Sequence, residues 1–348
     1  MKKIPVGILG ATGNVGQRFV QLLDNHPWFE VKYLCASEKS YGQRYGDIVN
    51  WKVSPKIPEN VASMRLRLCV PDFKARVVFS ALDSLVAGPI EEDFAKSGYI
   101  VISNSKNHRM DKDVPLLIPE VNPEHLDLIQ VQRKRFGGKG FIVTNPNCTT
   151  IGLTMALKPL QDAFGVSKVI VTTMQALSGA GYPGVPSLDA IDNVVPFIGD
   201  EEEKVETEPL KLLGSFSNGR INSANIAISA HCNRVAVRDG HLESVTVELI
   251  KKAGIEEILK VFRDFKSIPQ KLNLPSAPQN PIIVRMENDR PQPILDRDIN
   301  NGMSVSIGRV RQSSIFDIKF TLLVHNTIRG AAGAAILNAE LMKAKNII

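Results

Sequence analysis

Apolar positions change their spacing along the chain, and the first 150 residues contain short continuous apolar runs. Runs of this kind are typical of strands buried on both faces of a parallel sheet. They lie at 6–9, 33–35, 77–80, 99–103 and 141–144. Helical patterns follow at 17–23 and 90–95. This part is therefore predicted to be a Rossmann-type α/β domain with a doubly wound parallel sheet, which binds ligands at the carboxyl ends of its strands.

After Thr150 the pattern changes to alternation of polar and apolar residues, clearest at 244–249 and 316–322. Alternation indicates half-buried strands, so a second, α+β domain with a mostly antiparallel sheet is predicted. An Ala- and Leu-rich stretch at 329–342 predicts a terminal helix, although Gly330 and Gly333 weaken its start. We expect this helix to return to the first domain, giving one unit of 1–150 with 330–348 and another of 151–329.

Composition excludes several classes of protein. The 348 residues are 43% hydrophobic and 22% charged, unlike a disordered tail, a collagen or a coiled coil. The formal net charge is +6 without a basic run, which gives no reason to expect nucleic acid as a partner. The chain shows neither a signal-peptide pattern nor the ~20 apolar residues of a membrane span, so a cytoplasmic protein with no membrane partner is expected.

A glycine-rich turn joins the first strand to the first helix. Gly10, Gly13 and Gly16 are spaced G-x-x-G-x-x-G. Bare backbone at a helix N-terminus can accept a pyrophosphate, so the turn predicts a dinucleotide site. An ordinary tight turn is the alternative, because short motifs of this kind also occur by chance.

The residues after the second strand bear on the choice of dinucleotide. Ser37, Lys39 and Ser40 offer two hydroxyls and a cation, which suit a 2′-phosphate, whereas Glu38 would suit a free ribose hydroxyl. NADP is therefore favoured over NAD.

The four cysteines form neither a C-x-x-C metal motif nor a disulfide framework, so no metal site is predicted. Cys35 and Cys69 lie in apolar runs and are expected in the core. Cys148, within 145–150, follows the last strand of the first domain and precedes a helix that Pro159 is expected to kink or end. A helix N-terminus stabilises a thiolate, so Cys148 is the candidate nucleophile; an inert buried thiol is the alternative.

Asp239-Gly240 lies between two strand-like segments and predicts a two-residue hairpin. Pairing of Arg238 with His241 across that turn would place Arg234, Arg238 and His241 on one face. An arginine there can hold a carboxylate with two parallel hydrogen bonds. The alternative is a solvated hairpin with ordinary surface charges.

Taken together, these motifs make the chain resemble the aspartate-β-semialdehyde dehydrogenases of the archaeal and fungal branch along its whole length. The resemblance rests on the glycine turn, the cysteine motif, a Gln-x-x-Ser-Gly-x-Gly motif, a Glu-rich helix start, and an arginine with a histidine on one strand pair. In this sequence they are 10–16, 145–150, 175–181, 201–204, Arg234 and His241.

The resemblance implies an NADP-dependent reduction of L-aspartyl-4-phosphate to L-aspartate 4-semialdehyde, with release of inorganic phosphate, on the pathway to lysine, threonine, methionine and isoleucine. It implies Cys148 as the nucleophile that forms a thioacyl intermediate, His241 as acid/base, and Asn147 and Gln175 as positioning groups. It also implies assembly as a homodimer or homotetramer through the sheet of 151–329.

The resemblance further implies which residues bind the ligands. Arg109 and Lys204 would bind the phosphate of the substrate, Glu201 its ammonium and Arg234 its carboxylate. An exposed acidic helix start is the alternative for Glu201 and Lys204. The implied cofactor contacts are Gly10, Thr12, Gly13, Asn14, Val15, Gly16, Ser37, Lys39, Ser40, Ser80, Ser178, Gly179 and Asn326.

Two other functions fit the sequence less well. A malonyl-CoA reductase of the same superfamily would depart from the pattern at the Glu-rich helix start and before the arginine, but Glu201 to Lys204 and Asn233-Arg234 are intact. A non-catalytic NADP-binding regulator would lack the nucleophile or the acid/base, and both are present.

Overall fold

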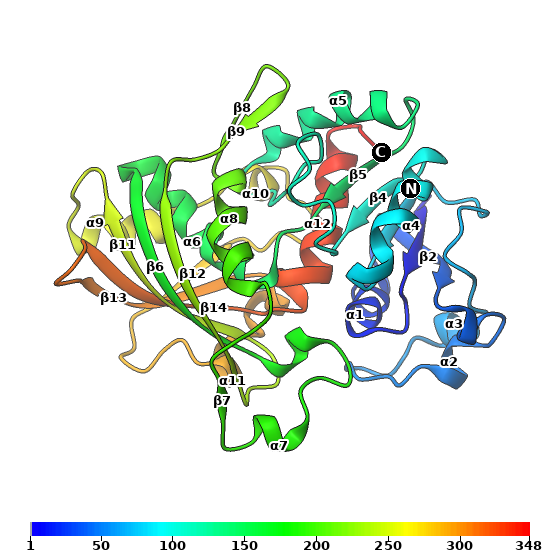
Figure 1. Ribbon diagram of the computed structural model, residues 1–348, viewed down its shortest axis with the longest axis horizontal. Helices are drawn as coiled ribbons and strands as arrows, with labels where there is room; N and C mark the ends of the chain where they lie inside the picture. Colours follow the sequence, from blue (N-terminus) through cyan, green and yellow to red (C-terminus); the bar gives the residue numbers. More distant parts are fainter. Residues whose placement is uncertain (1) are drawn as a thin grey trace.

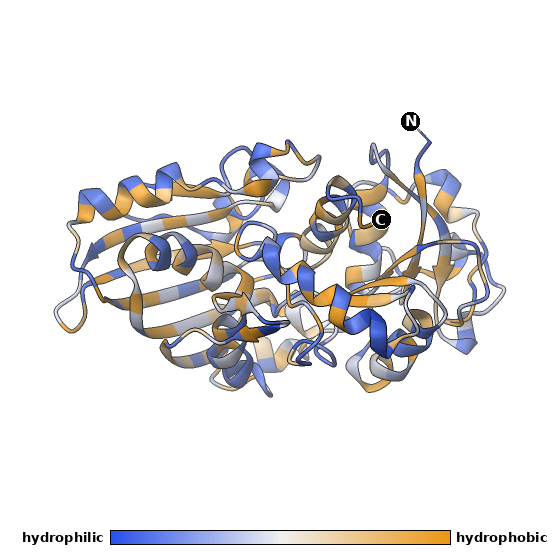
Figure 2. Ribbon diagram, turned by 90° about the horizontal axis from the view of Figure 1, so that it is seen from above, coloured by the Kyte–Doolittle hydropathy of each residue, from blue (hydrophilic) through white to orange (hydrophobic). Residues whose placement is uncertain are grey.

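The computed structural model describes residues 2–348. Its first sheet has five parallel strands in the order β2-β1-β3-β4-β5 (Figure 1). The apolar runs of β3, β4 and β5 are fully buried, as predicted, and the strands on the right of Figure 2 are largely coloured as hydrophobic. The strands are β1 (Ile4–Leu9), β2 (Phe29–Cys35), β3 (Val77–Ser80), β4 (Ile100–Ser103) and β5 (Phe141–Thr144). The order reverses between β1 and β3, which is where an open α/β sheet leaves a crevice for ligands.

Helices and short helical turns connect these strands. They are α1 (Asn14–Leu23), η1 (Glu38–Ser40), α2 (Tyr45–Ile48), α3 (Glu59–Ala62), α4 (Ser84–Lys96), η2 (Pro123–Asp127) and α5 (Leu128–Arg135). The helix predicted at 90–95 is thus the second half of α4. Cys35 is buried as expected, but Cys69 is only half-buried, because it lies in a bend rather than in a strand.

The second sheet is mixed and has the order β12-β13-β14-β11-β6-β10-β7. Its strand pairs are antiparallel except for β6–β10 and β12–β13, which confirms the predicted class. The strands are β6 (Val166–Gln175), β7 (Val194–Val195), β10 (Ala227–Val235), β11 (His241–Leu249), β12 (Ile282–Arg285), β13 (Val305–Gln312) and β14 (Ile318–Val324).

One face of this sheet is covered by three helices, of which α6 (Cys148–Phe164) contacts both α8 (Glu201–Leu212) and α9 (Ile255–Asp264). Their apolar residues and those of the strands form a second core. The remaining elements lie around the sheet. They are η3 (Leu177–Ala180), α7 (Ser187–Ala190), β8 (Ser215–Ser217), β9 (Arg220–Asn222), α10 (Ile268–Lys271), α11 (Pro293–Asp296) and η4 (Ile299–Gly302).

The hairpin predicted at Asp239-Gly240 is wrong, because β6 lies between β10 and β11. The Arg238 side chain is 74% exposed and lies away from the other two residues. Arg234 and His241 nevertheless meet, since Arg234 pairs with Gln175 of β6 and the residue after His241 pairs with the neighbouring Met174. A turn motif predicts the local bend of the chain. It cannot predict that a third strand lies between the two strands that the turn connects.

Pro159 does not end its helix, because α6 continues to Phe164. A proline inside a helix costs about 3 kcal/mol through its lost hydrogen bond and steric clash. Here α6 is buried for most of its length between the sheet, α8, α9 and the C-terminal segment, and this packing outweighs that cost.

The C-terminal segment returns to the first sheet, and it appears as the red helix between the two sheets (Figure 1). It begins with a π-helical turn, η5 (Ile328–Ala332), and continues as α12 (Gly333–Ala344). A Cβ atom on Gly330 would lie 2.8 Å from that of Cys148, so this glycine lets the segment pass directly against the cysteine. Within residues 2–348, no helix has both the length and the apolar character needed to cross a membrane.

Candidate active site

A cavity of about 840 Å³ lies between the carboxyl ends of the first sheet and the elements of the second. It brings together residues that are far apart in the sequence. Of the predicted site residues, its lining includes Gly10, Thr12, Gly13, Asn14, Val15, Ser37, Arg109, Asn147, Cys148, Gln175, Ser178, Gly179, Glu201, Lys204, Arg234 and Asn326.

The glycine turn fits a pyrophosphate. A Cβ atom on Gly10 would lie 2.6 Å from the Ala81 carbonyl oxygen, and one on Gly16 would lie 2.2 Å from that of Gly10, so both glycines are required by close backbone packing. A Cβ atom on Gly13 would have the Gly10 oxygen, at 3.6 Å, as its nearest neighbour, so this glycine leaves open space at the cavity. Helix α1 begins at Asn14 with no side-chain cap, which leaves its first-turn N–H groups free to bind an anion.

Four predicted cofactor contacts lie outside the cavity lining. Gly16 packs against the turn itself, while Lys39 and Ser40 lie on η1 beside Ser37, which does reach the cavity. Ser80 is fully buried at the end of β3, so direct contact of its side chain with a cofactor is not supported. The strand pattern places this serine at the correct end of the sheet but does not reveal what covers it.

Asn326 and Ser178 are held together at the other end of the cavity. The Asn326 amide donates to the Ser178 hydroxyl at 2.8 Å, and its Oδ1 accepts from the Gly240 N–H at 2.8 Å. Both ends of the amide are therefore engaged, which fixes its orientation at the wall of the cavity.

Cys148 is the first residue of α6, as predicted. Asn147 is the N-cap, and its Oδ1 accepts from the N–H groups of Thr149 at 2.9 Å and Thr150 at 3.2 Å. This cap fixes the direction in which the cysteine leaves the helix.

His241 lies next to the thiol. Its Nε2 is 3.1 Å from Cys148 Sγ, and its Nδ1 accepts from the Ala176 N–H at 3.0 Å. Because the Ala176 N–H can only donate a hydrogen bond, Nδ1 must accept it, and the neutral ring carries its proton on Nε2, the nitrogen that faces the sulfur. Burial, with the charge of Arg234, lowers the pKa of His241 to about 3, so the ring is neutral at physiological pH.

The pKa of Cys148 is set by opposing influences. Burial and the negative charge of Glu201 raise it to about 12, while the charges of Arg109 and Arg234 and the Thr149 N–H act in the opposite direction. The helix N-terminus alone therefore does not favour the thiolate at neutral pH, contrary to the expectation from the sequence. The helix N-terminus was visible in the sequence, but the burial and the acidic neighbour were not.

Glu201 is the centre of a polar network in the cavity wall. Its carboxylate accepts from Asn147 Nδ2 at 2.8 and 3.0 Å, from Gln175 Nε2 at 3.2 Å and from Lys204 Nζ at 2.8 Å. Although burial acts to raise the pKa of Glu201, Lys204 and these hydrogen bonds lower it below its usual value. Glu201 is therefore ionised and can hold an ammonium group.

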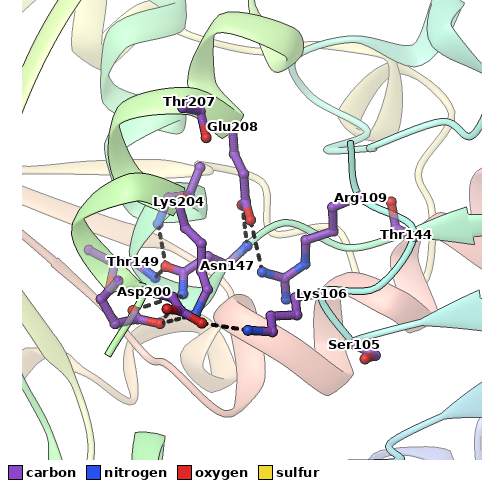
Figure 3. A network of polar contacts seen from close by, with 12 residues as sticks. Ser105, Lys106, Arg109, Thr144, Asn147, Thr149, Asp200, Lys204, Thr207 and Glu208 are labelled. Carbon is purple, nitrogen blue, oxygen red and sulfur yellow. Dashed lines mark hydrogen bonds and ion pairs between the residues drawn. The ribbon is translucent and has the colours of Figure 1, made fainter. Parts of the chain in front are cut away.

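Arg109 and Arg234 supply cationic groups at two sides of the cavity. Arg234 Nη1 donates to the Ala176 carbonyl at 2.8 Å, beside His241. Arg109 Nη1 donates to Glu208 Oε1 at 2.9 Å (Figure 3). Its Nη2 donates to the Asn104 carbonyl at 2.8 Å. Each guanidinium is fixed by the protein and still faces the cavity.

Glu208 was missed by sequence reasoning. It lies seven residues after Glu201 on α8, so both face the same side of the helix. It is 2% exposed, and its second oxygen accepts from the Asn147 N–H at 2.6 Å. The available signal was the seven-residue spacing from Glu201, which places a second carboxylate on the same face of the predicted helix.

Comparisons with known proteins agree with this geometry. Residues 5–129 match the family model "Semialdehyde dehydrogenase, NAD binding domain", and residues 157–329 match "Semialdehyde dehydrogenase, dimerisation domain". The chain is 54% identical to an aspartate-semialdehyde dehydrogenase of Archaeoglobus fulgidus and 48% identical to that of Schizosaccharomyces pombe, each over 99% of both chains. A crystal structure of the Candida albicans enzyme with NADP is 44% identical and covers both chains fully, with a TM-score of 0.92.

Proposed function

The chain belongs to the aspartate-semialdehyde dehydrogenase family, and we propose that it catalyses the NADP-dependent reductive dephosphorylation of L-aspartyl-4-phosphate to L-aspartate 4-semialdehyde. It is an oxidoreductase of amino-acid biosynthesis in the aspartate pathway. The observation that carries this proposal is that Cys148, which lines a cavity that also reaches the glycine turn, has its Sγ 3.1 Å from Nε2 of the buried His241.

The reaction needs a nucleophile that is regenerated. Cys148, as a thiolate, attacks the acyl carbon, and the carbon–oxygen bond to phosphate breaks to leave a thioester. Phosphate departs and takes up the proton that the overall reaction consumes. NADPH, when bound, supplies the hydride that reduces the acyl carbon. The carbon–sulfur bond then breaks, and the thiolate and the aldehyde are released.

His241 acts at the sulfur and at the oxygen of the reacting carbon. The Ala176 N–H on Nδ1 keeps the ring proton on Nε2, where it can be donated toward the thiolate and toward the negative oxygen that develops on the acyl carbon. This tautomer makes His241 a hydrogen-bond donor to both groups. Its role as the acid/base of the site stays a prediction from the resemblance.

The other polar residues of the cavity suit a substrate with an ammonium, a carboxylate and a phosphate. We assign the ammonium to the ionised Glu201, the carboxylate to Arg234, and the phosphate to Arg109 and Lys204. Pairing of the substrate ammonium with Glu201 would also cancel the charge that raises the pKa of Cys148. Asn147 and Gln175 donate to Glu201 and so support its position.

The cofactor assignment is supported by the open space at Gly13 and the uncapped start of α1, which fit the pyrophosphate. Ser37 at the cavity, with Lys39 beside it, suits a 2′-phosphate. We further propose residues 1–150 with 330–348 as the NADP-binding unit and 151–329 as the substrate-binding and oligomerisation unit. Cytoplasmic localisation stays a prediction from the sequence.

We propose a homo-oligomer that uses the sheet face opposite α6, α8 and α9, built on the match to a dimerisation domain. On that face Ile170, His231 and Ser244 of three adjacent strands are exposed. The change Ile170→Arg is expected to dissociate the oligomer in analytical ultracentrifugation. An unchanged sedimentation coefficient would place the interface elsewhere, and the wild-type value separates dimer from tetramer.

The function is tested by phosphate-dependent reduction of NADP⁺ with aspartate semialdehyde, measured on purified wild-type protein, Cys148→Ser and Cys69→Ser. The first variant should lose activity by roughly three orders of magnitude or more, because no thioester can form. The second should retain it, because Cys69 lies outside the cavity. Reduction of malonyl-CoA in place of this activity, or full turnover by Cys148→Ser, would refute the proposal.

A further inference from the structure

Helix α8 presents a row of charged side chains to the active site and to the loop that carries Arg109. Glu201, Lys204, Glu208 and Lys211 are spaced by three, four and three residues, which places them on one face of the helix. The first two belong to the substrate pocket described above. The other two contact the protein itself.

Glu208 joins two parts of the site that come from different segments. One oxygen accepts from Arg109 Nη1 at 2.9 Å, and the other accepts from the Asn147 N–H at 2.6 Å (Figure 3). Arg109 is the group assigned to phosphate, and Asn147 caps the helix that begins with the nucleophile. One buried carboxylate therefore sets the position of the phosphate-binding group relative to the start of α6.

Lys211 holds the main chain of the same loop. Its Nζ donates to the carbonyl oxygens of Arg109, Asp111 and Val114 at 2.7, 2.7 and 2.9 Å. The guanidinium of Arg109 is thus held by Glu208 and its backbone by Lys211, and both residues come from α8. The location of Arg109 depends on this helix as well as on the loop that follows β4.

Arg109 keeps donors for a ligand. A guanidinium has five N–H donors. One on Nη1 is used by Glu208 and one on Nη2 by the Asn104 carbonyl, and the buried Nε has no hydrogen-bond partner among residues 2–348. The fixed side chain therefore keeps one further N–H on each of Nη1 and Nη2 for a ligand in the cavity that it lines.

We propose that Glu208 is a positioning residue that fixes Arg109 for phosphate binding and ties it to the cap of the nucleophile helix. The inference rests on the proposed function, because it uses the assignment of Arg109 to phosphate. A merely structural ion pair would affect all substrates and the melting temperature alike. Loss of a positioning residue should weaken phosphate binding more than the binding of aspartate semialdehyde or NADPH.

The test is the change Glu208→Gln, which keeps the size of the side chain but leaves a single oxygen to accept hydrogen bonds. In phosphate-dependent oxidation of aspartate semialdehyde, we expect the KM for phosphate to rise by about 10- to 100-fold, as when a buried charge-assisted hydrogen bond is lost. A lower kcat should accompany it, while the KM for aspartate semialdehyde and the Kd for NADPH change by less than about twofold.

Glu203→Gln is the matched control, because Glu203 is exposed on the same helix and should leave every constant near wild type. Glu208→Asp keeps the charge, but its side chain is too short to reach both partners. It should show the same selective rise in the KM for phosphate. This variant provides the test if Glu208→Gln does not fold. A phosphate KM equal to that of the Glu203 variant, or equal losses for all three ligands, would overturn the inference. Wild-type protein without phosphate-dependent activity would instead overturn the proposed function.

Discussion

Removal of the Glu201 charge should make Cys148 more reactive and the enzyme slower. Glu201 is the largest influence after burial that raises the pKa of the Cys148 thiol. A like charge within ~4–6 Å shifts a pKa by about 1 to 3, and Lys204, 2.8 Å from the carboxylate, already compensates part of it. The change Glu201→Gln should therefore lower the pKa of Cys148 by about 1.

The size of the effect on reactivity follows from two opposing factors. A pKa lower by about 1 gives roughly tenfold more thiolate at pH values below the pKa. The nucleophilicity of a thiolate falls as its pKa falls, with a Brønsted slope of about 0.4–0.5, which reduces the gain by roughly threefold. Cys148 of Glu201→Gln should thus react about threefold faster than in the parent protein.

The assay is the rate of mixed-disulfide formation with an aromatic disulfide at pH 8, followed by mass spectrometry of the Cys148 peptide. A Cys69→Ser background removes the half-buried competing thiol. Glu203→Gln is the control and should react at the parental rate. Steady-state turnover of the Glu201 variant should fall, because the substrate ammonium has lost its carboxylate. An unchanged or slower reaction of Cys148 would refute the proposed electrostatic role of Glu201.

Three further predictions concern stability and cofactor choice. Arg329 and Glu120 form a fully buried two-bond ion pair, so Arg329→Met should lower the free energy of unfolding by about 3–5 kcal/mol in urea titrations, and adding Glu120→Leu should restore most of it. Burial lowers the pKa of His125 to about 4 from its ordinary 6.5, so the folded protein should lose up to about 3 kcal/mol as pH falls from 6.5 to 4, and His125→Gln should show a smaller loss. Lys39→Ala should weaken NADPH binding about tenfold in fluorescence titrations and leave NADH within twofold; equal weakening would place the 2′-phosphate elsewhere.

Features encoded by local pattern were predictable from the sequence. The continuous apolar runs located all five strands of the first sheet, and a cysteine directly after the last strand located the start of α6. Features that depend on distant packing were not. The insertion of β6 between β10 and β11, the burial of Ser80 and the raised pKa of Cys148 all arise from segments that lie far away in the sequence.

Glu208 is a further residue whose role depends on distant packing and could not be predicted from the sequence. Its spacing from Glu201 is that of a shared helix face, but a carboxylate in a Glu-rich helix is normally solvated, so the sequence alone offered no reason to select it. Its role became visible when the structure placed Arg109 and the Asn147 N–H on either side of it. Sequence pattern identified the helix, and tertiary contacts identified which of its acids matter.

The return of the C-terminal helix also constrains how the protein is made. Ile336, Leu337, Leu341 and Met342 belong to the same apolar core as Val6, Phe19 and Phe79. On the ribosome, the segment that carries the glycine turn therefore emerges first but cannot complete its core until residues 336–342 have also emerged. During synthesis the apolar surface of this segment stays uncovered until α12, encoded more than 200 residues downstream, can pack against it. The core beneath the nucleotide site is consequently complete only after residues 336–342 have been synthesised.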